Sequence, residues 1–138
     1  MATWQDYLRE ADRFWNVAQA IDAPGYRSQA VSNAIHAVIA ANDAVCLFHT
    51  GQRAKGDSHA EAAAMLTRAC KGTALEQQLP QRSRQLADVL QHKSASQYYG
   101  KQIDPDTARR VMTQAERFVQ WVRDTLTQPE SEQPPGDE

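Results

Sequence analysis

The hydrophobic pattern of the chain is helical, and its most apolar stretch covers residues 26–50. Apolar residues recur there at steps of three and four positions, the spacing that keeps one face of a helix buried. They are Val31, Ala34, Ile35, Val38, Ala41, Val45 and Phe48. The pattern predicts one long buried helix that ends near His49, with Gly51 as its cap.

Polar residues interrupt this helix with a period of their own: Gln29, His36, Asp43 and Thr50 lie seven positions apart. Seven residues turn a helix by about 700°, so successive members of the set lie within about 20° of one another. Polar groups on an apolar helix cost stability unless they find partners. His36 and Asp43 therefore indicate a functional site, a hydrogen-bonded pair buried between two helices, or the polar seam of a dimer.

Apolar spacing and capping residues predict further helices. Thr3 can cap the first, Ser58 the third, and Asp104 the last, which has Pro105 at its first position. Pro80 is expected to interrupt the chain before the fourth helix. The expected ranges are 3–21, 58–72, 81–93 and 104–127. Trp121 lies off the apolar face of the last helix, which predicts an interface residue.

These elements predict an all-α fold, an antiparallel up-and-down bundle of four to five helices. We find no strand pattern, no glycine-rich phosphate loop and no internal repeat. Residues 1–127 are expected to form this single domain. Residues 128–138 are acidic, contain proline and lack apolar content, so we expect a disordered tail.

The composition narrows the class of protein. The two cysteines, Cys46 and Cys70, fall in predicted helices beside apolar residues, which favours a reducing compartment over a disulfide framework. The N-terminus lacks the basic and then apolar pattern of a signal peptide, and the longest apolar run, 37–41, is far shorter than the roughly 20 residues of a membrane span. A cytoplasmic protein that does not bind membranes is expected. The sequence also predicts no cofactor, and no metal because its His, Cys, Asp and Glu residues lack metal-ligand spacing.

Charge is uneven along the chain. The formal net charge is −2, but four of the acids lie in the predicted tail. Residues 53–101 contain eight Arg and Lys against four acids. This mildly basic middle is compatible with a phosphate-bearing partner such as RNA, and equally with a solvated helical surface.

The loop that follows the long helix contains the residues best suited to chemistry. Arg53 and His59 have five residues between them, and Lys55 lies in the same loop. The Ser58 cap puts His59 in the first turn of the third helix. An imidazole can accept and return a proton near neutral pH, and a planar guanidinium matches phosphate oxygens in a bidentate way. The alternative is a set of solvated surface charges.

With this loop and these helices, the chain resembles the HEPN superfamily of small helical-bundle proteins. The spacing Arg53-x5-His59 fits the Arg-x(4–6)-His motif of that superfamily. The first helix has an aromatic-rich apolar face, as in the superfamily, and the resemblance extends over residues 3–126. The other segments that carry it are Ser32-Asn33-Ala34-Ile35-His36-Ala37, Ala40-Ala41-Asn42-Asp43-Ala44, Gln97-Tyr98-Tyr99-Gly100 and Ala115-Glu116-Arg117-Phe118-Val119.

Active members of this superfamily are metal-independent ribonucleases that work as homodimers. The resemblance implies that His59 is the general acid and base, that Arg53 binds the reacting phosphate, and that Asp43 is the polar residue added by the second helix. His36, Lys55 and Tyr98 are the candidate binding residues. A tyrosine such as Tyr98 can stack on a base, although tyrosines also close helical bundles.

The resemblance implies two further alternatives. The ribonuclease can be the toxic half of a toxin–antitoxin pair or a defence component. Other branches of the superfamily are non-catalytic modules that bind a partner protein, such as an antitoxin or a nucleotidyltransferase, or a nucleotide. A third reading is a purely structural helical dimer without a ligand.

Overall fold

The computed structural model describes residues 2–55, 58–93 and 102–127. In these ranges the chain forms five α-helices and one short 3₁₀ helix, without a strand, which confirms the predicted all-α class. The elements are α1 (Trp4–Ala20), α2 (Arg27–Thr50), α3 (His59–Cys70), η1 (Glu76–Gln78), α4 (Leu79–Leu90) and α5 (Pro105–Thr127). The predicted tail, 128–138, lies outside the described residues.

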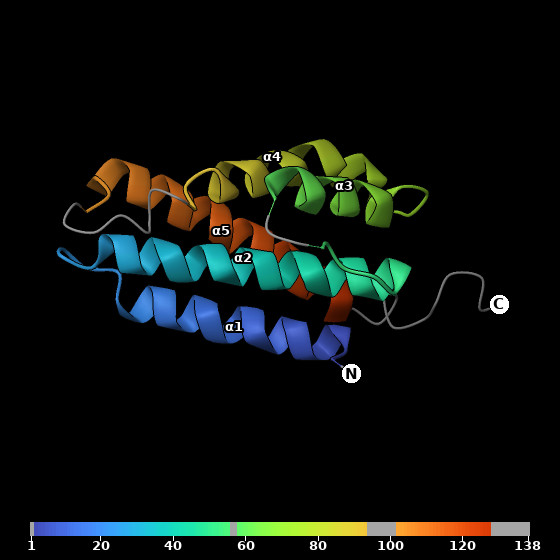
Figure 1. The fold of residues 1–138 in the computed structure, drawn as a ribbon, viewed down its shortest axis with the longest axis horizontal. Helices are drawn as coiled ribbons and strands as arrows, with labels where there is room; N and C mark the ends of the chain where they lie inside the picture. Colours follow the sequence, from blue (N-terminus) through green and yellow to red (C-terminus); the bar gives the residue numbers. More distant parts are fainter. Residues whose placement is uncertain (1, 56–57, 94–101, 128–138) are drawn as a thin grey trace.

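Helix α2 occupies the centre of the fold. It packs against α1, α3 and α5, while α4 packs against α3 and α5. Figure 1 shows α1 on one side of α2 and the pair α3 and α4 on the other. Of the 24 residues of α2, 14 are buried, and six of those are alanines that let the neighbouring helices approach closely. The expectation of one long buried helix is confirmed.

The central position of α2 explains its high hydropathy. The helix is long and apolar enough to cross a membrane, and 67% of its most apolar 18 residues is buried inside the structure. A core helix enclosed by other helices has the same properties, so the result does not indicate a membrane.

Capping residues set most of the helix boundaries where the sequence predicts them. Thr3 and Asp6 form a capping box before α1, Gly51 ends α2 with a φ of 75°, and the Asp104 carboxylate accepts a hydrogen bond from Thr107 N at 2.9 Å. The expected interruption at Pro80 is wrong. Pro80 lies in the first turn of α4, where its missing N–H has no partner to lose.

The core contains one residue that the sequence assigned to an interface. Trp121 is buried within the chain, with 6% of its surface exposed, and its ring centroid lies 5.6 Å from that of Phe118. At the outer side of α5, the Arg123 guanidinium pairs with Asp12 on α1. This ion pair attaches α5 to α1, while the opposite side of α5 packs against α4.

The two cysteines are buried and unpaired. Burial raises the pKa of the Cys46 thiol to about 12 and that of Cys70 to about 11. Because the thiolate is the reactive form, both side chains act as packing groups rather than nucleophiles.

Candidate active site

A small cavity lies where α2, the loop after it, α3 and α4 meet. Its volume is about 130 Å³. The three residues predicted to be catalytic, Asp43, Arg53 and His59, all line it. Its remaining lining residues are Ile39, Asn42, Ala54, Ser58, Ala62, Leu86, Leu90 and Lys93. Residues separated by up to 54 positions in the sequence, Ile39 and Lys93, therefore share one site.

The loop after α2 positions Arg53. Gly51 turns the chain out of α2 in the left-handed conformation, which glycine adopts without steric cost. The Arg53 guanidinium carbon then lies 5.4 Å from the centroid of the Tyr7 ring on α1, a cation–π distance. The guanidinium thus lies between the Tyr7 ring of α1 and the cavity. The Arg53 side chain is 52% exposed.

Asp43 is the buried acid of the site. Its side chain is 10% exposed, and Arg53 Nη1 lies 3.8 Å from Asp43 Oδ2. Burial raises the pKa of Asp43 to about 6, because a carboxylate loses hydration there, and the charge of Arg53 offsets only part of this effect. Asp43 can therefore exchange a proton near neutral pH, which an ordinary carboxyl cannot.

His59 is the first residue of α3, as predicted from its capping residue. The Ser58 hydroxyl accepts a hydrogen bond from Glu61 N at 3.0 Å and so fixes the start of the helix. His59 is exposed while it lines the cavity. The site thus combines an exposed imidazole, a buried carboxyl with a raised pKa, and a half-exposed guanidinium near that carboxyl.

Asn42 is a cavity residue that the sequence did not single out for function. Its side chain is 2% exposed; Nδ2 donates to the Ala62 carbonyl at 3.3 Å, and Oδ1 has no partner. The only sequence signal is its place beside Asp43 in an alanine-rich helix. An unpaired buried acceptor lowers the stability of the ligand-free protein, and it can accept a hydrogen bond from a hydroxyl or amine of a bound molecule.

Two of the three predicted binding residues, His36 and Lys55, do not line this cavity. His36 is exposed and stacks on Phe14 with ring centroids 5.2 Å apart, so the interpretation of His36 and Asp43 as a buried pair is wrong. Lys55 is exposed and is not a lining residue. Tyr98 lies outside the described residues.

Among the described residues, no group of three His, Cys, Asp or Glu side chains is placed to hold a metal ion. Comparison with known protein families and with curated protein sequences gives no significant match to this chain. The site is therefore interpreted from its own residues.

The raised pKa of Asp43 predicts a pH-dependent cost to the fold. The folded protein binds the Asp43 proton more tightly than the unfolded chain does. The bound proton therefore stabilises the fold fully below about pH 4, and this contribution to the free energy of unfolding is lost as the pH rises through 6. We expect Asp43→Asn to raise the free energy of unfolding at pH 7.5 by about 1–2 kcal/mol. The expected gain is below the full pKa difference because the amide of the variant also loses hydration on burial.

Urea unfolding of wild type and Asp43→Asn at pH 4.5 and 7.5 measures this effect. The variant's advantage should be clear at pH 7.5 and shrink at pH 4.5. Asp22→Asn, at an exposed carboxyl in the turn before α2, is the matched control and should change stability little at either pH. An Asp43→Asn protein that is less stable than wild type at pH 7.5 would show that the Arg53 pairing outweighs burial.

Proposed function

We propose that this protein is a metal-independent endoribonuclease of the HEPN type, built on an antiparallel up-and-down bundle. The single observation that carries the proposal is the cavity on which Asp43, Arg53 and His59 lie together. Two groups that can move protons and one fixed cation are the parts that RNA cleavage without a metal needs.

The proposed reaction is an internal transfer at one RNA phosphate. His59 takes the proton of a ribose 2′-OH, and the 2′-oxygen forms a bond to the adjacent phosphorus. The bond from phosphorus to the 5′-oxygen breaks, and that oxygen receives a proton from Asp43 in its protonated form. The products are a 2′,3′-cyclic phosphate and a 5′-hydroxyl. Arg53 binds the non-bridging oxygens, on which charge develops.

The size of the cavity fits this assignment. A volume of about 130 Å³ is well below that of a pocket for a whole small molecule. It suits the reacting phosphate and part of its ribose, with the rest of the strand on the open surface beside Arg53. As in the HEPN enzymes it resembles, we propose that the protein works as a homodimer, within a toxin–antitoxin or defence pair.

One observation favours a second candidate, a non-catalytic HEPN module that binds a partner protein such as a nucleotidyltransferase, or a nucleotide. The charge of Arg53 already has two neighbours, the Asp43 carboxyl at 3.8 Å and the Tyr7 ring. A guanidinium engaged in this way has less charge to offer a phosphate. The cleavage assay separates the two candidates.

The test is cleavage of a mixed-sequence RNA by the purified protein in EDTA. We expect cleavage that continues without divalent metal and leaves 2′,3′-cyclic phosphate and 5′-hydroxyl ends. An oligonucleotide with a single 2′-deoxy substitution at a mapped cleavage site should resist cutting there, because it lacks the attacking oxygen. Cutting of that substituted site, or 5′-phosphate products, contradicts the proposed chemistry; no cleavage of any RNA favours the binding module.

A further inference from the structure

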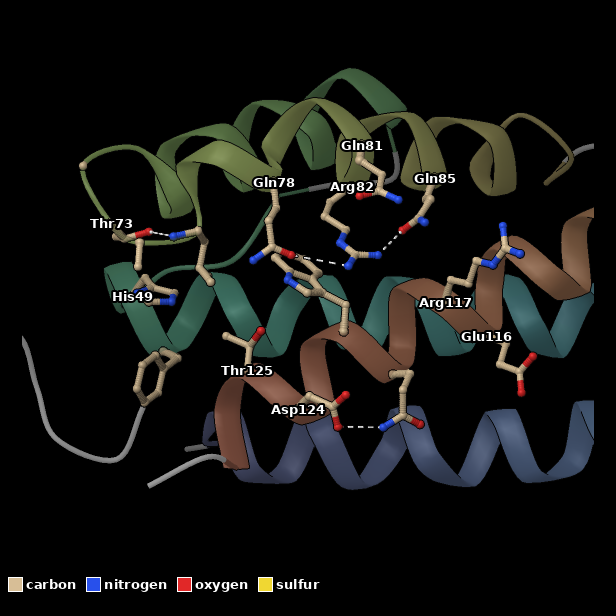
Figure 2. Close-up of a pocket in the computed structure, with 16 residues that line it drawn as sticks. His49, Thr73, Gln78, Gln81, Arg82, Gln85, Glu116, Arg117, Asp124 and Thr125 are labelled. Carbon is tan, nitrogen blue, oxygen red and sulfur yellow. Dashed lines mark hydrogen bonds between the residues drawn. The ribbon is translucent and has the colours of Figure 1, made fainter. Parts of the chain in front are cut away.

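A second hollow, the α4/α5 groove, lies on the other flank of α4. Its volume is about 1190 Å³, and none of its lining residues lines the cavity around Asp43. Figure 2 shows Gln81, Arg82 and Gln85 of α4, with Gln78 of η1 just before them, on one wall, and Glu116, Arg117, Asp124 and Thr125 of α5 on the other. The C-terminal end of α2, with Phe48 and His49, and the turn after α3, with Thr73 and Leu75, close one end of the groove.

Arg82 lies at the centre of this groove and is fixed by neutral groups. Its Nη1 donates to Gln85 Oε1 at 3.0 Å and its Nη2 to Gln78 Oε1 at 3.4 Å (Figure 2). The guanidinium carbon lies 5.2 Å from the centroid of the Trp121 ring. The cation is therefore oriented by two amides and an aromatic face, none of which cancels its charge.

The charge of Arg82 has no carboxylate partner among the described residues. The ion pairs formed within those ranges involve other arginines. Of the acids in the groove, Asp124 instead accepts a hydrogen bond from Gln120 at 2.7 Å. Burial lowers the pKa of Arg82, as expected for a cation that has lost water without gaining an anion.

Unused hydrogen-bond donors gather around the same point. Arg82 Nε and Trp121 Nε1 are both buried without a partner, and each can only donate. His49 Nε2, at the closed end, is a third buried nitrogen without a partner. Trp121 is more than nine-tenths buried, so its N–H is a costly donor to leave unpaired. What the groove lacks is an acceptor, preferably a negatively charged one.

We propose that the α4/α5 groove is a binding site for a small organic oxyanion, a carboxylate or phosphate carried on an apolar or aromatic body. The oxyanion accepts from the N–H groups of Arg82 Nη1 and Nη2 that Gln85 and Gln78 leave free, beside the Trp121 ring. The apolar body packs against Phe48, Leu75 and the indole ring. Carboxylates and phosphates match a guanidinium in a bidentate way, which makes such contacts strong and directional.

The test uses three probes of nearly the same shape: phenylacetate, phenyl phosphate and the neutral phenylacetamide. Binding to the full-length protein is followed by the indole N–H signal of Trp121 in ¹H–¹⁵N NMR spectra. The chain has three tryptophans, so a Trp121→Phe spectrum assigns this signal. We expect the signal to shift on titration with an anion and to stay in place with the amide. Binding of both anions, or of one alone, identifies which oxyanion the groove selects.

Arg82→Gln tests the residue itself, because glutamine keeps a polar side chain and removes the charge. We expect it to weaken anion binding at least about tenfold while the unfolding midpoint stays near that of wild type. Arg110→Gln, the same change at an exposed position of α5 outside the groove, should change affinity by less than about twofold. Equal binding of phenylacetamide, or an Arg82→Gln protein that binds the anions as wild type does, would overturn the proposal. Neither result depends on RNA cleavage.

Discussion

His59→Ala is expected to slow RNA cleavage by about 10²–10⁴-fold, the usual contribution of a general acid or base. The imidazole is the exposed, proton-accepting group on the cavity that contains Asp43 and Arg53. In the proposed reaction, its loss leaves the 2′-hydroxyl without a base, while the phosphate can still bind at Arg53. The effect should therefore fall mainly on the cleavage rate at saturating RNA rather than on RNA binding. Initial rates with a defined oligonucleotide in EDTA measure it.

The matched control for this variant is Glu61→Ala. Glu61 is also exposed in the first turn of α3, but it does not line the cavity. The Glu61→Ala protein should cleave RNA at a rate within about threefold of wild type and unfold at a similar midpoint, because surface substitutions usually have small effects. Arg53→Lys adds a second comparison, because it keeps the charge and loses the bidentate geometry. Wild-type rates in the His59→Ala protein would remove His59 from the mechanism.

Phe118→Ala is expected to lower the free energy of unfolding by about 3–5 kcal/mol, the range for emptying a fully buried aromatic site. Phe118 is completely buried and has the largest volume among the fully buried side chains of the described residues. Its removal leaves a void beneath Trp121, and the rigid helices around it can close the void only in part. Since domains of this size are stable by roughly 5–15 kcal/mol, the variant loses a large share of its stability.

Guanidinium unfolding of wild type and Phe118→Ala gives this value directly. Phe14→Ala is the matched control, since Phe14 is only half-buried on α1, where it stacks on the exposed His36. The same chemical change there should cost less than about 2 kcal/mol, because little enclosed space is created. If Phe14→Ala costs more than Phe118→Ala, Phe118 does not occupy the buried position described above.

Much of the fold follows from local signals in the sequence. The caps at Thr3, Gly51 and Asp104 act through hydrogen bonds within a few residues, so their effects are visible in the sequence itself. Trp121 could not be assigned in the same way. It lies off the apolar stripe of α5, and it is buried because Arg82, 39 positions earlier, crosses over its ring. Only tertiary packing brings those two residues together.

The candidate site was predictable only in part, because some of its features depend on tertiary packing. Helical period places His36 and Asp43 on one side of α2, but period alone does not say which of them will be covered. The loop after Gly51 folds back over Asp43, while His36 remains exposed beside Phe14. Leu86, Leu90 and Lys93 of the α4 region complete the cavity. Their contribution depends on how α4 docks against α2 and α3, which no local pattern contains.

The position of α4 between the two hollows has a thermodynamic consequence. One flank of this helix supplies Leu86 and Leu90 to the cavity, and the other supplies Arg82 and Gln85 to the groove. A ligand that displaces α4 from either flank changes the free energy of binding at both. By linkage, an oxyanion that alters RNA affinity twofold must have its own affinity altered twofold by RNA. If both proposed sites bind their ligands, α4 is the shared element through which each ligand can change the affinity of the other, although the two sites have no lining residue in common.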